Sequence, residues 1–105
     1  MESVSRRRLQ GLLGLAVRKR AVAFGRTACR RAAERANLHL VLVAMDAGAS
    51  ALRDSALPAS VRIVPVQLNK VELGQLVGRA ELALLGITDP HLSAGLLECA
   101  RTDGM

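Results

Sequence analysis

The residues best suited to chemistry in this chain are the arginines that follow Gly25. Residues 22–46 read VAFGRTACRRAAERANLHLVLVAMD, in which a short apolar run stops at the glycine and a helical pattern begins there. The first turns of that helix carry Arg26, Arg30 and Arg31. A helix N-terminus presents free backbone N–H groups and the positive end of the helix dipole, and arginines add further positive charge. The expected ligand of such a surface is a polyanion.

The charge of the chain is distributed unevenly along the sequence. It has 15 Lys+Arg against 9 Asp+Glu, a formal net charge of +6. Residues 1–52 hold ten basic and three acidic side chains, and residues 53–105 hold five and six, so the two parts carry +7 and −1. A basic half is typical of proteins that bind nucleic acid or an anionic membrane, although a solubilising surface explains charge alone equally well.

The composition argues against several classes of protein. No apolar run reaches membrane-spanning length, and the arginine-rich start lacks the apolar segment of a secretory signal, which predicts a cytoplasmic protein without membrane contact. Cys29 and Cys99 stand singly and without ligand spacing to a histidine, which predicts reduced thiols, no metal and no cofactor. No Ser-His-Asp order and no phosphate loop is present, so we expect no catalytic residues and no enzymatic activity.

The aromatic content limits how the chain could bind RNA. Phe24 is the single aromatic residue. The base-stacking platforms of sheet-type single-strand binders are therefore absent, and RNA contacts are expected from helix ends, backbone groups and arginines.

An alternation of helices and strands is predicted to position these residues. Helices are expected at 7–18, from 25 onward, at 70–77 and after Asp89-Pro90, and strands at 21–24, 38–44, 61–66 and 82–87. Asn69 and Glu72 match a capping box, and residues 46–55 suggest a loop with a short helix. Regular alternation with buried strands predicts a three-layer α/β/α sandwich. A single domain is expected over residues 1–105, with residues 1–6 as a flexible tail.

Three stretches of the chain resemble a known family. They are LLGLAVR at 12–18, FGRTACRRA followed by LVLVAMD, and NKVELGQLVGR at 69–79 followed by ALLGITD. Over about residues 9–97 the chain resembles the small bacterial, ribosomal-protein-like members of the ribosomal protein L-seven-Ae / L-thirty-e superfamily, whose members bind kink-turn and related RNA folds. The resemblance implies a mixed four-stranded sheet with helices on both faces. It also implies an RNA surface built from the N-terminus of the second helix and the loop before the last helix.

Carrying the resemblance over residue by residue gives a candidate site. Gly25 matches the glycine whose backbone approaches the RNA, Arg31 matches the helix lysine, and residues 86–89 match the loop before the last helix. The full set of residues predicted to bind RNA is Gly25, Arg26, Thr27, Arg30, Arg31, Lys19, Arg20, Ile87 and Thr88.

The chain departs from the kink-turn binders at the two positions that read sheared G·A pairs. Those positions are usually Asn-Glu, or Lys-Gln in some bacterial proteins, and here they are Thr27 and Ala28. Thr27 can donate and accept a hydrogen bond, whereas Ala28 can do neither. Two functions stay open. One is non-enzymatic binding of structured RNA, kink-turn-like and ribosomal, by a monomer within a ribonucleoprotein; the other is a protein-interaction module of the same fold that has lost specific RNA reading.

Overall fold

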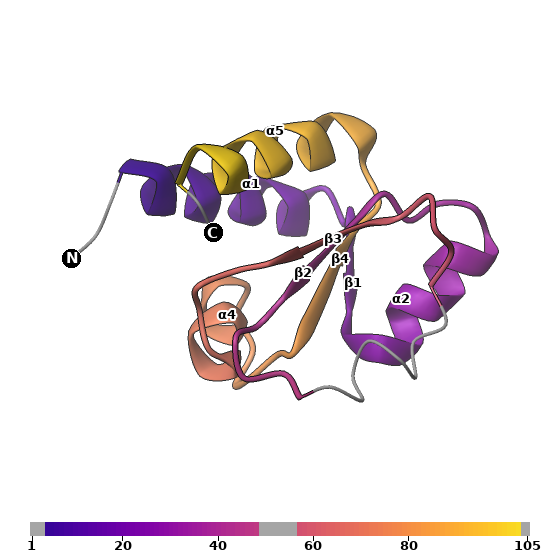
Figure 1. Ribbon diagram of the computed structural model, residues 1–105, viewed down its shortest axis with the longest axis horizontal. Coiled ribbons are helices and arrows are strands. Elements are labelled where there is room, and N and C mark those ends of the chain that lie inside the picture. Colours follow the sequence, from indigo (N-terminus) through magenta and orange to yellow (C-terminus); the bar gives the residue numbers. More distant parts are fainter. Residues whose placement is uncertain (1–3, 49–56, 104–105) are drawn as a thin grey trace.

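The computed structural model describes residues 4–48 and 57–103 (Figure 1). The elements in chain order are α1 (Val4–Arg18), β1 (Val22–Phe24), α2 (Gly25–Glu34), β2 (Leu40–Val43), β3 (Arg62–Pro65), α4 (Lys70–Leu76), β4 (Leu84–Ile87) and α5 (Pro90–Asp103). Helix α1 begins three residues before the predicted start, so residues 4–6 are helical where a tail was expected, and residues 1–3 lie outside the described part. Most of the segment with the expected short helix, residues 49–55, also lies outside it.

The four strands form one mixed sheet in the order β1-β4-β2-β3. Strand β4 is antiparallel to both of its neighbours, while β2 and β3 are parallel. The central strands β2 and β4 are buried at every position, as expected for apolar runs covered on both faces. The mixed four-stranded sheet implied by the family resemblance is confirmed.

Helices cover both faces of the sheet, which confirms the predicted three-layer sandwich. Helices α1 and α5 lie side by side over one face together with α4, and α2 covers the other face (Figure 1). Strand β2 divides its side chains between the two layers: Leu40 and Leu42 pack toward α1 and α5, and Val41 and Val43 pack toward α2. This alternation follows from the two-residue period of a strand. None of the helices in the described ranges is long and apolar enough to cross a bilayer.

Helix α2 packs close to the sheet because the residues between them are small. A Cβ atom added to Gly86 of β4 would lie 2.8 Å from Cys29 Sγ, 2.8 Å from Leu38 Cδ1 and 3.2 Å from Ala23 Cβ. Real Cβ atoms essentially never approach other heavy atoms to 2.8 Å, so the first two contacts would force a shift. The glycine at position 86 therefore sets the distance between α2 and the sheet.

Helices α1, α2 and α4 end in the same backbone motif. In each, one residue after the helix adopts a left-handed conformation, and the N–H of the following residue bonds back to a carbonyl of the last turn, which satisfies carbonyls that the helix leaves unpaired. The left-handed residues are Arg20 (φ 56°), Ala36 (φ 55°) and Gly78 (φ 79°). The closing bonds run from Ala21 to Ala16, from Asn37 to Ala32 and from Arg79 to Gly74, at 2.8, 2.9 and 2.8 Å.

The start of α4 confirms the predicted capping box. Asn69 Oδ1 accepts a hydrogen bond from the Glu72 N–H at 2.8 Å, and Glu72 Oε1 accepts one from the Asn69 N–H at 2.9 Å. The Lys70 N–H, one residue further on, donates to Asp46 Oδ1 at 2.8 Å. These bonds fix where α4 begins relative to the end of β2.

Candidate nucleic-acid interface

An open groove of about 650 Å³ lies between the edge strand β1 and helix α2. We call it the arginine groove, because the residues that line it in the described part of the chain include four arginines and no carboxylate: Arg20, Arg31, Arg35 and Arg79. The remaining lining residues are Val22, Ala23, Phe24, Thr27, Ala28, Ala32, Asn37 and Thr88. Four positive charges gathered in one groove favour an anionic ligand.

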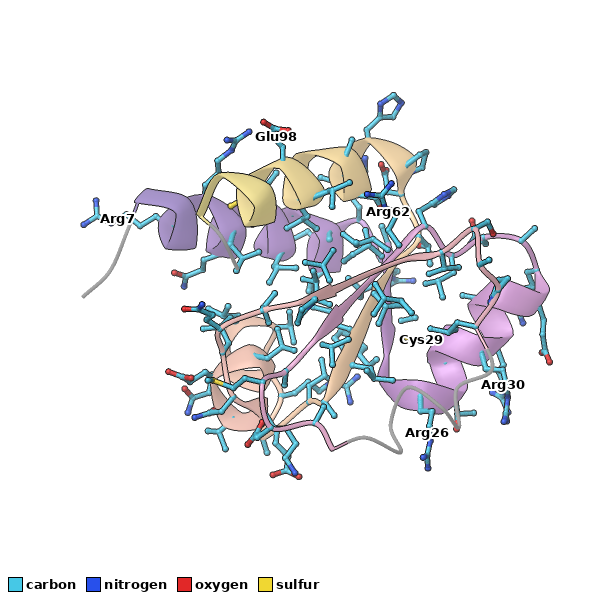
Figure 2. The ribbon with its side chains drawn as sticks, in the orientation of Figure 1. Arg7, Arg26, Cys29, Arg30, Arg62 and Glu98 are labelled. Carbon is cyan, nitrogen blue, oxygen red and sulfur yellow. The ribbon has the colours of Figure 1, made fainter. Side chains whose placement is uncertain are left out.

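Helical periodicity explains which residues of α2 face the groove. Thr27, Arg31 and Arg35 are spaced by four, so they share one side of the helix. Arg26 and Arg30 belong to the same helix but extend away from the sheet, outside the groove (Figure 2). Together the two sets make α2 basic both toward the groove and toward solvent.

The start of β1 brings two further residues to the groove. Arg20 occupies the left-handed position after α1 and lines one end of the groove. The Thr88 N–H donates to the Ala21 carbonyl at 2.9 Å, which holds Thr88 beside the start of β1. A left-handed conformation costs about 1 kcal/mol for a residue other than glycine. The position therefore carries an arginine although a glycine there would be less strained.

Arg79 lies at the other end of the groove and was not among the predicted residues. Its guanidinium carbon is 4.1 Å from the centroid of the Phe24 ring. Phe24 is the residue that precedes α2, so this contact joins the loop after α4 to the start of α2. In the sequence, Arg79 could be recognised as a basic residue directly after Gly78, the left-handed residue that follows α4.

The loop that carries Arg79 is fixed against α4 by Gly74. The Arg79 N–H donates to the Gly74 carbonyl at 2.8 Å, and the Leu82 N–H donates to the Lys70 carbonyl at 2.9 Å. A Cβ added to Gly74 would lie 2.7 Å from the Glu81 Cα. The glycine therefore permits the close approach that positions the loop.

Gly25 is required by its own backbone conformation. Its φ is +87°, which residues with a side chain rarely adopt, and in the described part of the chain no heavy atom outside its chain neighbours and its own helix backbone lies within 4 Å of the position of an added Cβ. The turn from β1 into α2 is thus sufficient to explain the glycine, while the space beside it is open to a ligand.

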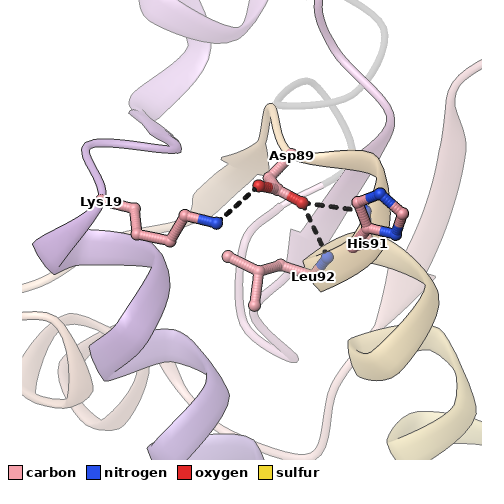
Figure 3. Close-up of polar contacts among 4 residues, drawn as sticks. All are labelled: Lys19, Asp89, His91 and Leu92. Carbon is pink, nitrogen blue, oxygen red and sulfur yellow. Dashed lines mark hydrogen bonds and ion pairs between the residues drawn. The ribbon is translucent and has the colours of Figure 1, made fainter.

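Lys19 and Asp89 pair with each other on the side of the sheet where α1 and α5 lie (Figure 3). Lys19 Nζ is 3.1 Å from Asp89 Oδ2, and Asp89 Oδ1 accepts hydrogen bonds from the N–H groups of His91 and Leu92 at 2.8 and 3.0 Å. Asp89 is thus the predicted cap of α5. The Leu92 N–H and the Lys19 ammonium hold the pKa of Asp89 below its usual range.

The structure divides the predicted site. Four of its residues line the groove: Arg20, Thr27, Arg31 and Thr88. Gly25, Arg26 and Arg30 lie at the start and on the outer side of α2. The arginine groove also contains Arg35, Asn37 and Arg79, which the sequence reasoning missed.

Two of the predicted residues do not fit the site. Ile87 does not line the groove, because its side chain is fully buried in the core between the sheet and the α1–α5 layer, the face opposite α2. Lys19 does not line the groove, and its ammonium is paired with Asp89.

The cysteine of α2 is a packing residue. Cys29 Sγ is buried and donates to the Ala23 carbonyl at 3.6 Å, and burial raises the pKa of its thiol to about 11. A protonated, buried thiol is neither a nucleophile nor a metal ligand. Within residues 4–48 and 57–103, no three His, Cys, Asp or Glu side chains gather in a way that could hold a metal ion.

Comparison with known proteins rests on structure. No protein-family model matches the chain, and no curated protein does. A Bacillus halodurans protein of unknown function matches with a TM-score of 0.79 and 27% identity, over 89% of this chain and 96% of that one. The Giardia lamblia 15.5kD RNA binding protein matches with a TM-score of 0.69 and 17% identity, over 97% of this chain and 89% of that one. The chain shares its fold with both proteins.

Proposed function

We propose that this chain is a non-enzymatic protein that binds structured RNA through helix α2 and the arginine groove. The observation that carries the proposal is the composition of the groove, to which the described residues contribute four arginines and no carboxylate. Arg26 and Arg30 extend the basic surface beyond it along the outer side of α2. Phosphate groups require charge and N–H donors, both of which this surface offers.

Two further observations support RNA as the partner. A protein with the same fold, that of Giardia lamblia, is an RNA-binding protein. In addition, α2 has no acidic residue in its first turn, where a helix is stabilised by acids, and it has Arg26 there instead. A sequence selected for fold stability alone would favour the opposite charge at that position.

The proposal has three finer parts: the RNA fold is a kink-turn, the RNA is ribosomal, and the protein binds it as a monomer. Thr27 lies in the groove, where its hydroxyl can reach a base edge, while Ala28 forms part of the half-buried lining. Thr27 would therefore be the single remaining base reader, with phosphate contacts supplying most of the affinity.

The test measures binding to a kink-turn RNA and to the same RNA with its G·A pairs changed to Watson–Crick pairs, at two salt concentrations. We expect log affinity to fall with log salt by about 0.7 to 0.9 per phosphate contact. The site variant is Arg30→Glu with Arg31→Glu. Its matched control is Arg7→Glu with Arg8→Glu, which changes the net charge equally on exposed residues at the start of α1, far from α2 (Figure 2).

The two charge-reversed proteins separate a local site from a general charge effect. We expect the α2 variant to lose binding while the α1 control keeps most of it. Equal losses in both would refute the placement on α2. Absence of binding by the unmodified protein to either RNA would favour the protein-interaction module, and a preference for the intact kink-turn would identify Thr27 and its neighbours as readers of that motif.

A further inference from the structure

We propose further that the arginine groove holds an unpaired segment of the RNA, with one base stacked on the Arg79 guanidinium and the adjoining phosphates on Arg20, Arg31 and Arg35. This inference rests on the proposed function and names the part of an RNA that the groove would bind. It assigns a role to Arg79 and Arg35, which lie outside the set that the sequence predicts.

The stacking end of the groove is the Arg79–Phe24 pair. The ring of Phe24 supports one face of the guanidinium at 4.1 Å, and Arg79 is an exposed residue. A guanidinium over a ring can present its other side to a nucleobase, because bases stack on arginine planes as well as on aromatic rings. Phe24, the single aromatic residue, would thus support the arginine that stacks on a base instead of stacking on the base itself.

The phosphate end of the groove is formed by arginines from two different elements. Arg31 lies on α2 and Arg35 lies one turn further along, directly after the last residue of that helix; Arg20 follows α1 and lies beside Thr88. Along the helix, the distance from Thr27 near the stacking end to Arg35 is about 12 Å, at about 1.5 Å per residue. The groove is therefore long enough for more than one nucleotide.

The shape of the groove favours an unpaired segment over a duplex. Its floor is made of small side chains, Ala23, Ala28 and Ala32, between a helix and a strand. Its β1 wall is an edge strand, which presents backbone N–H and C=O groups that have no strand partner. A base exposes its face and its pairing edge to such a wall only when it is unpaired, whereas a duplex offers phosphates on a convex surface.

The test uses a fluorescein-labelled hexamer of uridine and a blunt RNA duplex of twelve base pairs as probes. The first variant is Arg79→Lys, which keeps the charge and removes the planar group. The second combines Arg20→Gln and Arg35→Gln. The control is Arg62→Lys, a change of the same kind on the exposed β3, at the opposite edge of the sheet. Circular dichroism and a urea midpoint verify that each variant is folded.

We expect Arg79→Lys to weaken hexamer binding by about 5-fold or more, as the loss of one stacked base predicts. Duplex binding should change by less than about 2-fold, because the charge is retained. The double variant should weaken the hexamer by at least about 10-fold, since each phosphate contact contributes. The control should alter neither. Hexaglutamate should compete poorly for the groove, because it has charge but no base to stack.

Three outcomes would overturn the inference, and they are distinguishable from failure of the proposed function. The first is a hexamer affinity that Arg79→Lys and Arg62→Lys change equally. The second is no hexamer binding while the kink-turn RNA binds, which leaves the proposed function intact. The third is competition by hexaglutamate as strong as by unlabelled hexamer, which would indicate an acidic peptide as the occupant. If no RNA binds at all, the proposed function fails as well.

Discussion

The guanidinium of Arg79 lies over the ring of Phe24, at 4.1 Å from its centroid, although the two residues belong to opposite halves of the sequence. The contact connects the loop after α4 to the junction of β1 and α2. An exposed cation–π contact contributes about 0.5 to 1 kcal/mol, too little to hold the fold by itself. Its importance is positional, since it orients an arginine plane at one end of a cationic groove.

Replacement of Arg20 by glycine should affect stability and RNA binding in opposite directions. Arg20 has a φ of 56°, so Arg20→Gly removes the strain of a left-handed conformation but adds the backbone entropy cost of a glycine. The difference between these two free energies should stabilise the fold by about 0.5 kcal/mol. The same change removes a groove cation and should weaken RNA binding. Urea unfolding and RNA titration measure the two effects.

Ala36 provides the matched control for that experiment. It has nearly the same conformation, with φ 55°, at the end of α2, and it is not part of the groove. Ala36→Gly should therefore give a similar gain in stability and leave RNA affinity unchanged. A loss of affinity in Ala36→Gly equal to that in Arg20→Gly would show that the backbone, rather than the arginine, matters for binding.

Gly86→Ala should destabilise the protein by about 1 to 3 kcal/mol, because the added methyl group would overpack the layer between α2 and the sheet. The position of its Cβ is 2.8 Å from both Cys29 Sγ and Leu38 Cδ1. Gly11→Ala is the comparison, since Gly11 is an exposed helix residue with no heavy atom within 4 Å of an added Cβ. That change should stabilise α1 by about 0.5 to 1 kcal/mol. Similar unfolding midpoints for the two variants would contradict the close packing.

The stability of the protein should depend on the ionisation of Asp89 at acid pH. The folded state lowers the pKa of this carboxyl, so its contribution is present above the unfolded value of about 3.9 and is lost as pH falls through the lower folded value. Asp89→Asn keeps a capping oxygen but removes this dependence. The difference in free energy of unfolding between the two proteins should be constant from pH 7 to pH 5 and shrink below pH 4. A constant difference down to pH 2.5 would exclude Asp89 as the titrating group.

Neither thiol should react in the folded protein. Cys29 and Cys99 are both buried, and the pKa of Cys29 is raised to about 11, so very little thiolate exists at pH 8. Ellman's reagent should detect no thiol in native protein and two per chain in urea. Rapid native reaction of one equivalent would mean that α2 separates from the sheet readily. Because the folded pKa of Cys29 lies above the unfolded one, its contribution to stability should be lost as pH rises toward 11.

Local patterns in the sequence were sufficient to predict most of the fold. The apolar run at 38–44 indicated a central strand, and the pairs Asn69–Glu72 and Asp89–Pro90 indicated two helix starts, because capping depends on residues close in sequence. The start of α1 was placed late, since the residues before Arg7 show no apolar periodicity.

The sequence predicted four residues of the groove: Thr27 and Arg31 on α2, and Arg20 and Thr88 beside the start of β1. Thr27 and Arg31 follow from helical spacing, whereas Arg79 reaches the groove through the order of strands and the course of the loop after α4, which no local pattern reveals. Ile87 lies outside the groove because a strand alternates its side chains between two faces, and the Ile87 side chain takes the face toward α1 and α5. The sequence of β4, apolar throughout, does not indicate which face each residue takes.

The shared ending of α1, α2 and α4 has an electrostatic consequence for the groove. Three of its four arginines stand where a helix stops: Arg20 after α1, Arg35 after α2 and Arg79 after α4. The carbonyl end of a helix carries about half a negative charge, so each of these three arginines lies beside the negative end of the helix that it follows. The helix ends thus reduce the repulsion between the arginines. The groove can therefore hold its positive charges together before a polyanion binds.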